Sequence, residues 1–297
     1  MRFIHNKPYT DPNRLTTGMF CVILALSEAF PLPIIIISDK ECLFEAYHEK
    51  GDCSVNGRFA NTILHKPPVF GQHISGGKTM NNNDYMIRLE TAKDYREVET
   101  LAREAFWNVS VPGCNEHYFI HVMRQHKDYI PELAYVMEMD GKIIGCIMYT
   151  KAELADENGN IKPIVSMGPL CIHPDYQRRG YSKALLEHTF EIVKSMGYDT
   201  VINFGNPDNY VARGYKSCKK YNVCFEGDVF PAALLVKVLR DDALDGRKWF
   251  YHPNNADEPC GNTEAVAEFD KLFPPKVKAW QPSQEEFYIH SHAFLRD

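Results

Sequence analysis

Between residues 86 and 240, apolar positions either alternate with polar ones or recur every three to four residues, which predicts an ordered series of strands and helices. The longest helix is expected at 180–196, because its apolar residues share one face and Gly197 follows as a terminating residue. Asp140-Gly141 separates two apolar runs, as is typical of a β-hairpin turn. Strands are expected at 87–89, 134–139, 142–149, 161–172, 199–204 and 232–239. Shorter helices are expected around 98–106, 115–125 and 208–213.

The order of these elements indicates the fold class. The helix at 180–196 lies between the strands at 161–172 and 199–204, so it is expected to cross over the sheet between them. The remaining strands follow one another closely along the chain. We therefore expect an α/β fold with a mixed, mostly antiparallel central sheet and flanking helices.

Two further regions flank this domain of residues 86–240. Residues 1–85 show no sustained helical period and end in a Gly- and Asn-rich linker. We expect them to form an N-terminal extension of unknown role, which either contains a buried strand at 34–37 or has no stable fold. Residues 241–297 carry too many aromatic side chains for a free tail, so this C-terminal extension is expected to pack on the domain, with helices at 262–272 and 283–290.

Charge and cysteine usage exclude several classes of protein. The net charge of −6 falls entirely on residues 86–297, which argues against a nucleic-acid partner held through phosphates. The nine cysteines form no CxxC pair, so we expect reduced, buried thiols in a cytoplasmic protein and no metal site. The apolar segment 20–38 contains Glu28, Pro31 and Pro33, and no membrane insertion is expected of it.

Residues 168–182 carry the clearest chemical signal. A buried strand enters a turn that opens the long helix, and the free backbone N–H groups at such a helix start attract a pyrophosphate. Arg178 and Arg179 add positive charge, and Gly180 lets the backbone approach a ligand closely. Any strand–turn–helix can contain a basic, glycine-bearing turn, so these three residues alone leave a purely structural role open.

A longer pattern around this turn resembles a known family. Ile172-His173-Pro174-x-x-Gln177-x-x-Gly180-x-Ser182 is similar to the acetyl-CoA loop, Gln/Arg-x-x-Gly-x-Gly/Ala, of the GNAT superfamily of N-acetyltransferases, with Ser182 at the usual Gly or Ala. A second segment, Asn203 to Tyr215, resembles the family's Asn-x-x-Ala-x-x-x-Tyr-x-x-x-Gly-Phe motif. Asn203, Tyr210 and Gly214 match it, and Asn206 departs from the usual Ala.

The resemblance implies an acyl-CoA N-acyltransferase fold and a transferase that moves an acetyl group from acetyl-CoA to a primary amine, by direct attack in a ternary complex. By resemblance, Tyr210 is the general acid that protonates the departing CoA thiolate, and Asn203 bonds the pantetheine arm. A backbone N–H near Leu170 or Cys171 would stabilise the oxyanion. The cofactor-binding residues implied are Leu170, Cys171, Ile172, Gln177, Arg178, Arg179, Gly180, Tyr181, Ser182 and Asn203.

Several alternatives stay open at this point. A small-molecule amine is the expected acceptor, with a protein or peptide amine, or a non-catalytic acyl-CoA sensor or scaffold, as alternatives. Residues 241–297 either cover the acceptor cleft or form a dimer contact. His173 and Cys171 are expected to be structural. Candidates for the general base are Glu104, Glu132 and Glu153, each of which is also typical of a solvated surface carboxylate.

Overall fold

The computed structural model describes residues 85–296, and the expected extension up to residue 84 lies outside them. The strands are β1 Met86–Leu89, β2 Tyr135–Met139, β3 Lys142–Asp156, β4 Ile161–Ile172, β5 Thr200–Phe204, β6 Lys216–Ser217, β7 Val223–Cys224, β8 Leu234–Val238 and β9 Trp249–His252. The α-helices are α1 Tyr95–Phe106, α2 Glu116–Met123, α3 Tyr181–Ser195, α4 Pro207–Tyr210, α5 Thr263–Asp270 and α6 Pro282–His292. Short 3-10 turns are η3 Pro131–Leu133, η4 Pro174–Tyr176, η5 Val211–Arg213, η6 Cys218–Tyr221 and η7 Glu258–Gly261.

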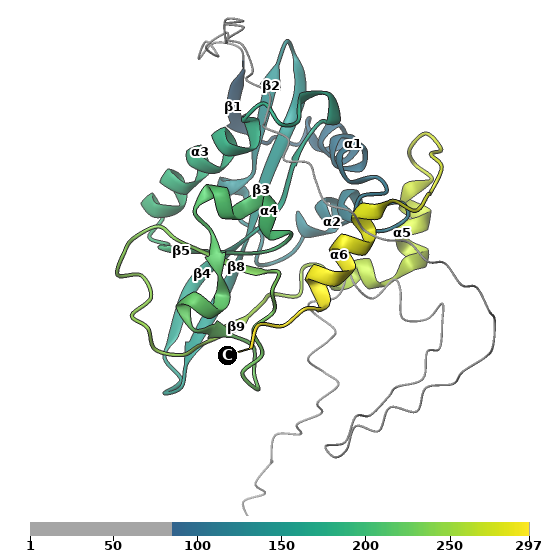
Figure 1. The fold of residues 1–297 in the computed structure, drawn as a ribbon. Helices are drawn as coiled ribbons and strands as arrows, with labels where there is room; N and C mark the ends of the chain where they lie inside the picture. The colour runs from purple at the N-terminus through teal and green to yellow at the C-terminus, as the bar shows by residue number, and fades with distance from the viewer. Residues whose placement is uncertain (1–84, 297) are drawn as a thin grey trace, which may run out of the picture. The chain divides into compact units, whose positions relative to one another are not determined.

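The described strands form one mixed sheet with the order β1-β2-β3-β4-β5-β8-β6, and β9 pairs with both β3 and β7. All pairs are antiparallel except β4–β5 and β7–β9. The helix α3 connects β4 to its parallel neighbour β5, as the crossover connection requires (Figure 1). The expected fold class, a mixed and mostly antiparallel sheet with flanking helices, is confirmed.

The helices pack against the sheet in two separate layers (Figure 1). One cluster joins Leu185 and Phe190 of α3 to Ile147 of β3, and another joins Leu101 of α1 to Met148 of β3. Because successive residues of a strand point to opposite faces, Ile147 and Met148 place α3 on one face and α1 on the other. Both faces of the central strands are therefore buried.

The strands β4 and β5 separate after a short paired stretch. They pair only at Val165↔Val201 and Ser166↔Ile202, close to the start of β5. Just beyond, the register with β3 shifts between Ile147 and Tyr149, so that Gly168 and Pro169 of β4 lie opposite one residue of β3. This bulge and the end of the pairing leave an opening between the last residues of β4 and β5.

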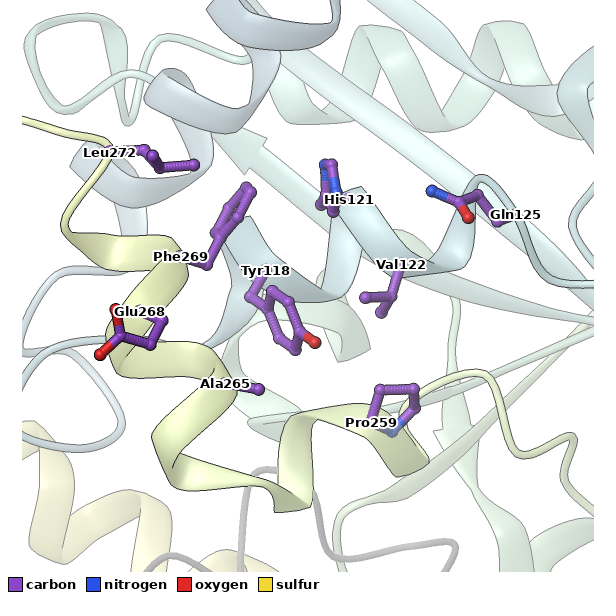
Figure 2. Close-up of a pocket in the computed structure, with 9 residues that line it drawn as sticks. All are labelled: Tyr118, His121, Val122, Gln125, Pro259, Ala265, Glu268, Phe269 and Leu272. Atoms are coloured by element: carbon purple, nitrogen blue, oxygen red, sulfur yellow. The ribbon is translucent and has the colours of Figure 1, made fainter.

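The C-terminal extension contributes to the sheet and covers the helices on one side of it. β9 continues the sheet by pairing with residues 153–156 of β3. Phe269 of α5 makes ring contacts with Tyr118 and His121 of α2, with centroids 5.3 and 4.6 Å apart (Figure 2). At the start of α6, the side chain of Gln284 donates a hydrogen bond to the carbonyl of Asn108 at 3.0 Å.

Asp270, at the end of α5, is the centre of a buried polar cluster. The guanidinium of Arg103, which is 1% exposed, donates to its carboxylate at 2.6 and 3.3 Å. His117 Nε2 lies 3.2 Å from the same carboxylate, and His117 Nδ1 lies 3.3 Å from Cys114 Sγ. Burial lowers the pKa of His117 to about 4 and raises the pKa of the Cys114 thiol well above its usual range. This Cys-His-Asp row therefore anchors α5 and does not provide an activated thiol.

Several elements differ from the sequence prediction. The strands β6, β7 and β9 were not expected, because segments of two to four residues show no measurable period. The strand β3 continues to Asp156, where β9 and β4 cover its two edges. All six cysteines within residues 85–296 are buried and free, whereas Cys21, Cys42 and Cys53 lie outside that range. No helix in the described part of the chain is long and apolar enough to span a bilayer.

Candidate active site

A pocket of about 350 Å³ lies where β4 and β5 separate. Residues 167–170 of β4 and residues 203–206, at and just beyond the end of β5, line it. Other lining residues come from α1, α2 and the C-terminal extension, Phe106, Phe119 and Phe287 among them. The pocket therefore brings together segments that are widely separated in sequence at the opening between β4 and β5.

A second, more open pocket lies between α2 and α5 (Figure 2). Its lining residues are Tyr118, His121, Val122, Gln125, Pro259, Ala265, Glu268, Phe269 and Leu272. None of them belongs to the segments 168–182 or 203–215 that carry the chemical motifs. The pocket at the opening of the sheet is therefore the candidate active site.

The start of α3 has open backbone N–H donors beside two basic side chains. Gly180 caps the helix with φ +90°, in the left-handed region, and no side chain caps the backbone N–H groups of the first turn. A Cβ built on Gly180 meets no atom within 4 Å, so the space in front of this backbone is open. Arg178 and Arg179 are exposed beside it. A pyrophosphate fits this combination of open backbone donors and positive charge.

The predicted motif residues contribute mainly their backbone. Gln177 donates from its side chain to the carbonyl of Ile172 at 3.0 Å, which fixes the turn. The side chains of Cys171, Ile172 and Tyr181 are buried in the core. Any contact of these three residues with a ligand must therefore come from main-chain atoms. The side-chain amide of Gln177 is already engaged within the turn, through its bond to the Ile172 carbonyl.

Ser182 and Asn206, the two residues that depart from the family pattern, both accept hydrogen bonds within the protein. Ser182 Oγ accepts a hydrogen bond from Arg213 Nη2 at 3.0 Å, which joins the start of α3 to the end of η5. Asn206 caps α4, since its Oδ1 accepts from the N–H of Asp208 at 3.0 Å. His173 caps η4 in the same way through the N–H of Asp175, so its expected structural role agrees with its position.

The last residues of β4 present a free backbone edge to the opening. Beyond Ser166, β4 makes no ladder contacts with β5 among the described residues. Leu170 lines the pocket, and Pro169 before it has no N–H group to offer. An extended ligand can therefore pair with this edge as an added strand, and the N–H groups near Leu170 are the donors available to a carbonyl oxygen.

Tyr210 and Asn203 meet on the β5 side of the pocket. A Cβ on Gly205 would lie 2.9 Å from Cε2 of Tyr210, so only glycine leaves room for this ring. Burial raises the pKa of Tyr210 to about 12, against smaller lowering effects from the Arg213 charge and a hydrogen bond with Asn203. Asn203 is 2% exposed, and its Oδ1 has no hydrogen-bond partner within residues 85–296. An amide N–H of a ligand would satisfy this acceptor.

The pocket also contains a carboxyl group that the sequence did not single out. Glu116, in the first turn of α2, lines the pocket and accepts a hydrogen bond from the N–H of Asn115 at 3.0 Å. Burial raises its pKa to about 7. A glutamate in the first turn is ordinary for any helix, so the sequence carries no signal that separates it from a surface residue.

The three glutamates that were considered as general bases lie elsewhere. Glu104 forms an ion pair with Lys276 at 2.7 Å, and Glu132 and Glu153 are exposed. None of the three lines the pocket. Their expected alternative, an ordinary surface carboxylate, describes all of them.

The C-terminal extension lines part of the pocket through residues between 251 and 260 and between 283 and 287, whereas no residue of the α3 turn, 177–182, is in the lining. The hydroxyl of Tyr251 in β9 donates to Ser166 Oγ at 3.4 Å. Asn254 donates from its side chain to Thr150 Oγ1 and to the carbonyl of Lys151, both at 2.8 Å. These contacts hold the loop after β9 over the pocket. No group of three or more His, Cys, Asp or Glu side chains suited to a metal ion occurs within residues 85–296.

Comparison with known proteins gives a consistent set of similarities. Residues 99–216 match the acetyltransferase (GNAT) family. The chain is 28% identical over 128 residues to the uncharacterized N-acetyltransferase YjhQ of Escherichia coli (strain K12), a match that covers 43% of this chain and 65% of that relative's length.

Two solved structures resemble the described fold. One is the GNAT family N-acetyltransferase YhbS from Escherichia coli in complex with CoA, with a TM-score of 0.49 and 22% identity over 58% of this chain and 91% of the other. The second is a GNAT family acetyltransferase from Brucella melitensis in complex with acetyl-CoA, with a TM-score of 0.45 and 19% identity over 58% and 97%.

Proposed function

We propose, from the premise that this chain carries a domain of the acetyltransferase (GNAT) family over residues 99–216, that it transfers an acetyl group from acetyl-CoA to a primary amine of a small molecule. One observation carries the proposal: a single pocket at the opening of the sheet is lined by both a half-buried phenol, Tyr210, and a half-buried carboxyl, Glu116. Acyl transfer to an amine needs a proton donor and a proton acceptor of this kind.

The residues present fit acetyl-CoA. The open first turn of α3, with Arg178 and Arg179 beside it, would hold the pyrophosphate. The free edge of β4 and the unpartnered Oδ1 of Asn203 would pair with the amides of the pantetheine arm. When bound, acetyl-CoA supplies a thioester whose carbonyl carbon is open to attack by an amine.

The chain's own groups then divide the proton transfers between them. Glu116, with a pKa near 7, takes a proton from the incoming ammonium, since only a neutral amine can attack. A backbone N–H near Leu170 donates to the carbonyl oxygen as negative charge develops on it. Tyr210 hands its proton to the departing sulfur. The C–N bond forms as the C–S bond breaks, and the nitrogen gives its second proton to the Tyr210 phenolate, which restores the phenol. Glu116 releases its proton to solvent, so the products are the N-acetyl amine, CoA with a free thiol and one proton.

The walls that the C-terminal extension adds to the pocket favour a small acceptor over a protein side chain. Tyr251 and Asn254 hold the C-terminal extension over it, and Phe287 of α6 adds a further wall. A lysine on a folded protein would need an open surface groove in which to lie, whereas a free amine needs only the mouth of the pocket.

The experiment that tests the function is a thermal-shift titration of the full chain with acetyl-CoA, followed by detection of free CoA thiol in the presence of amines. Binding to the native state should raise Tm with increasing acetyl-CoA concentration. Gly180→Trp should abolish the rise, because the indole would fill the open space in front of the α3 backbone. No rise in Tm for the unmodified chain would contradict the proposal. A rise without turnover on any amine would favour a sensor or scaffold.

The Glu116→Gln variant should show an altered pH profile. In the unmodified protein, kcat/KM should rise with pH through about 7 as Glu116 loses its proton and becomes able to act as a base. The glutamine variant should lack this limb and be slower by about 10²-fold at pH 8. The measurement is kcat/KM from pH 5.5 to 9 with one amine, beside Glu132→Gln as a matched control on an exposed carboxylate. The same limb in both variants would rule out Glu116 as the base.

A further inference from the structure

All the charged side chains that line the pocket are acidic. They are Glu116, Asp257 and Glu286, and no lysine, arginine or histidine of the described chain joins them in the lining. A pocket of one sign of charge favours ligands of the opposite sign, both in binding and in encounter. One carboxyl group, Glu116, suffices to take the proton of the reacting amine, so two acidic side chains remain to be explained.

Glu286 lies on the face of α6 that is turned to the pocket. The N-terminal end of α6 is held in place by Ser283, which donates to the carbonyl of Val109 at 2.8 Å, and by the contact of Gln284 with Asn108. Residues 283, 286 and 287 share one face of a helix, and all three line the pocket. Glu286 remains exposed, so its carboxylate lies at the mouth and can meet a hydrated cation.

Asp257 approaches the pocket from the loop between β9 and η7. Asp257 and Tyr251 both line the pocket. The Tyr251 hydroxyl contacts Ser166, next to the point where β4 and β5 separate. The two remaining carboxylates therefore come from two different parts of the C-terminal extension and face the same cavity.

The walls between these carboxylates are largely aromatic. Phe106, Phe119, Phe204, Tyr251 and Phe287 all line the pocket. Aromatic faces accept both aliphatic methylene groups and alkylammonium ions. The pocket also contains the Oδ1 of Asn203, a buried acceptor without a hydrogen-bond partner among the described residues, which a polar group of a bound ligand can satisfy.

We propose that the acceptor is a linear diamine or longer polyamine, whose second ammonium group is held by Glu286 and Asp257 while the first reacts beside Glu116. This inference rests on the proposed function and deepens it by naming the acceptor class. The aliphatic chain between the two amines lies along the aromatic walls. Acetylation converts the first ammonium group into a neutral amide, and the second ammonium group stays at the mouth of the pocket.

The test compares matched acceptors on the full chain at pH 7.5. 1,5-Diaminopentane and pentylamine have the same chain length and differ in the second amine, and 2-phenylethylamine tests the aromatic walls alone. We expect kcat/KM for the diamine to exceed that for either monoamine by on the order of tenfold, mainly through a lower KM. The Glu286→Gln/Asp257→Asn double variant should bring the three amines within about threefold of one another. Glu285→Gln, an exposed neighbour outside the pocket, is the control and should keep the preference.

A binding readout separates this inference from the function on which it rests. In the presence of CoA, 1,5-diaminopentane should raise Tm further in the unmodified chain, and the double variant should lose this second rise. Turnover of pentylamine or 2-phenylethylamine at least equal to that of the diamine would overturn the inference and leave the acetyltransferase in place. Failure to release CoA thiol with every amine, without a Tm response to acetyl-CoA, would instead contradict the proposed function.

Discussion

Replacing Tyr210 with phenylalanine is expected to lower kcat for acetyl transfer by about 10²- to 10³-fold while acetyl-CoA still binds. The hydroxyl is the only atom removed, and the ring keeps its edge-to-face contact with Tyr215, whose centroid lies 5.5 Å away. Without the hydroxyl, the sulfur must leave as a thiolate in a buried pocket, where no solvent compensates its charge. The measurement is single-turnover release of CoA thiol together with the acetyl-CoA thermal shift.

The raised pKa of Tyr210 is compatible with this role. A phenol with a pKa of about 12 stays fully protonated at neutral pH, so the proton is always available. The same burial that raises the phenol's pKa also raises the proton affinity of the departing thiolate, because both anions lose solvation. Tyr215→Phe is the matched control: its hydroxyl is buried without a partner among the described residues, so turnover should change less than threefold. An unchanged kcat in Tyr210→Phe would exclude Tyr210 as the acid.

Replacing Asp270 with alanine is expected to lower the free energy of unfolding by about 3 kcal/mol, since it leaves the buried Arg103 guanidinium without its counter-charge. The loss should also loosen α5 from α2, because His117 contacts the same carboxylate. Urea denaturation at pH 7.5 measures the change. Asp242→Ala removes an exposed ion pair with Arg240 and should leave the urea midpoint nearly unchanged. Equal effects of the two substitutions would show that the Asp270 cluster does not anchor α5.

The parts of the fold that sequence predicted are those fixed by local chemistry. Asp140 and Gly141 both have positive φ, as their hairpin turn requires, and Gly197 ends α3 with φ +90°. The crossover of α3 between β4 and β5 followed from element order alone. Such features depend on a few neighbouring residues, so they can be read before any tertiary contact is known.

The acceptor side of the pocket could not be predicted in this way. Tyr251 contacts Ser166, and Gln284 contacts Asn108. The partners lie far apart in the sequence, and no hydrophobic period along the chain indicates which distant residues will meet. Burial raises the pKa of Glu116, and a position in the first turn of a helix gives no sign of that burial. The Cys171 side chain lies in the core, as expected, and so does that of Tyr181, which the motif alone did not reveal, because a motif records which residues recur and not which atoms face the ligand.

The C-terminal extension and the two motif segments line different parts of the same pocket. Residues 168–170 and 203–210 contribute to one part of the lining, which we propose receives the acyl donor, whereas residues between 251 and 287 supply much of the remaining wall. Substitutions in the extension can therefore alter which amine is accepted without disturbing the part that receives the acyl donor. A lineage could acquire a new acceptor by remodelling α6 and the loop after β9, with the catalytic groups inherited intact.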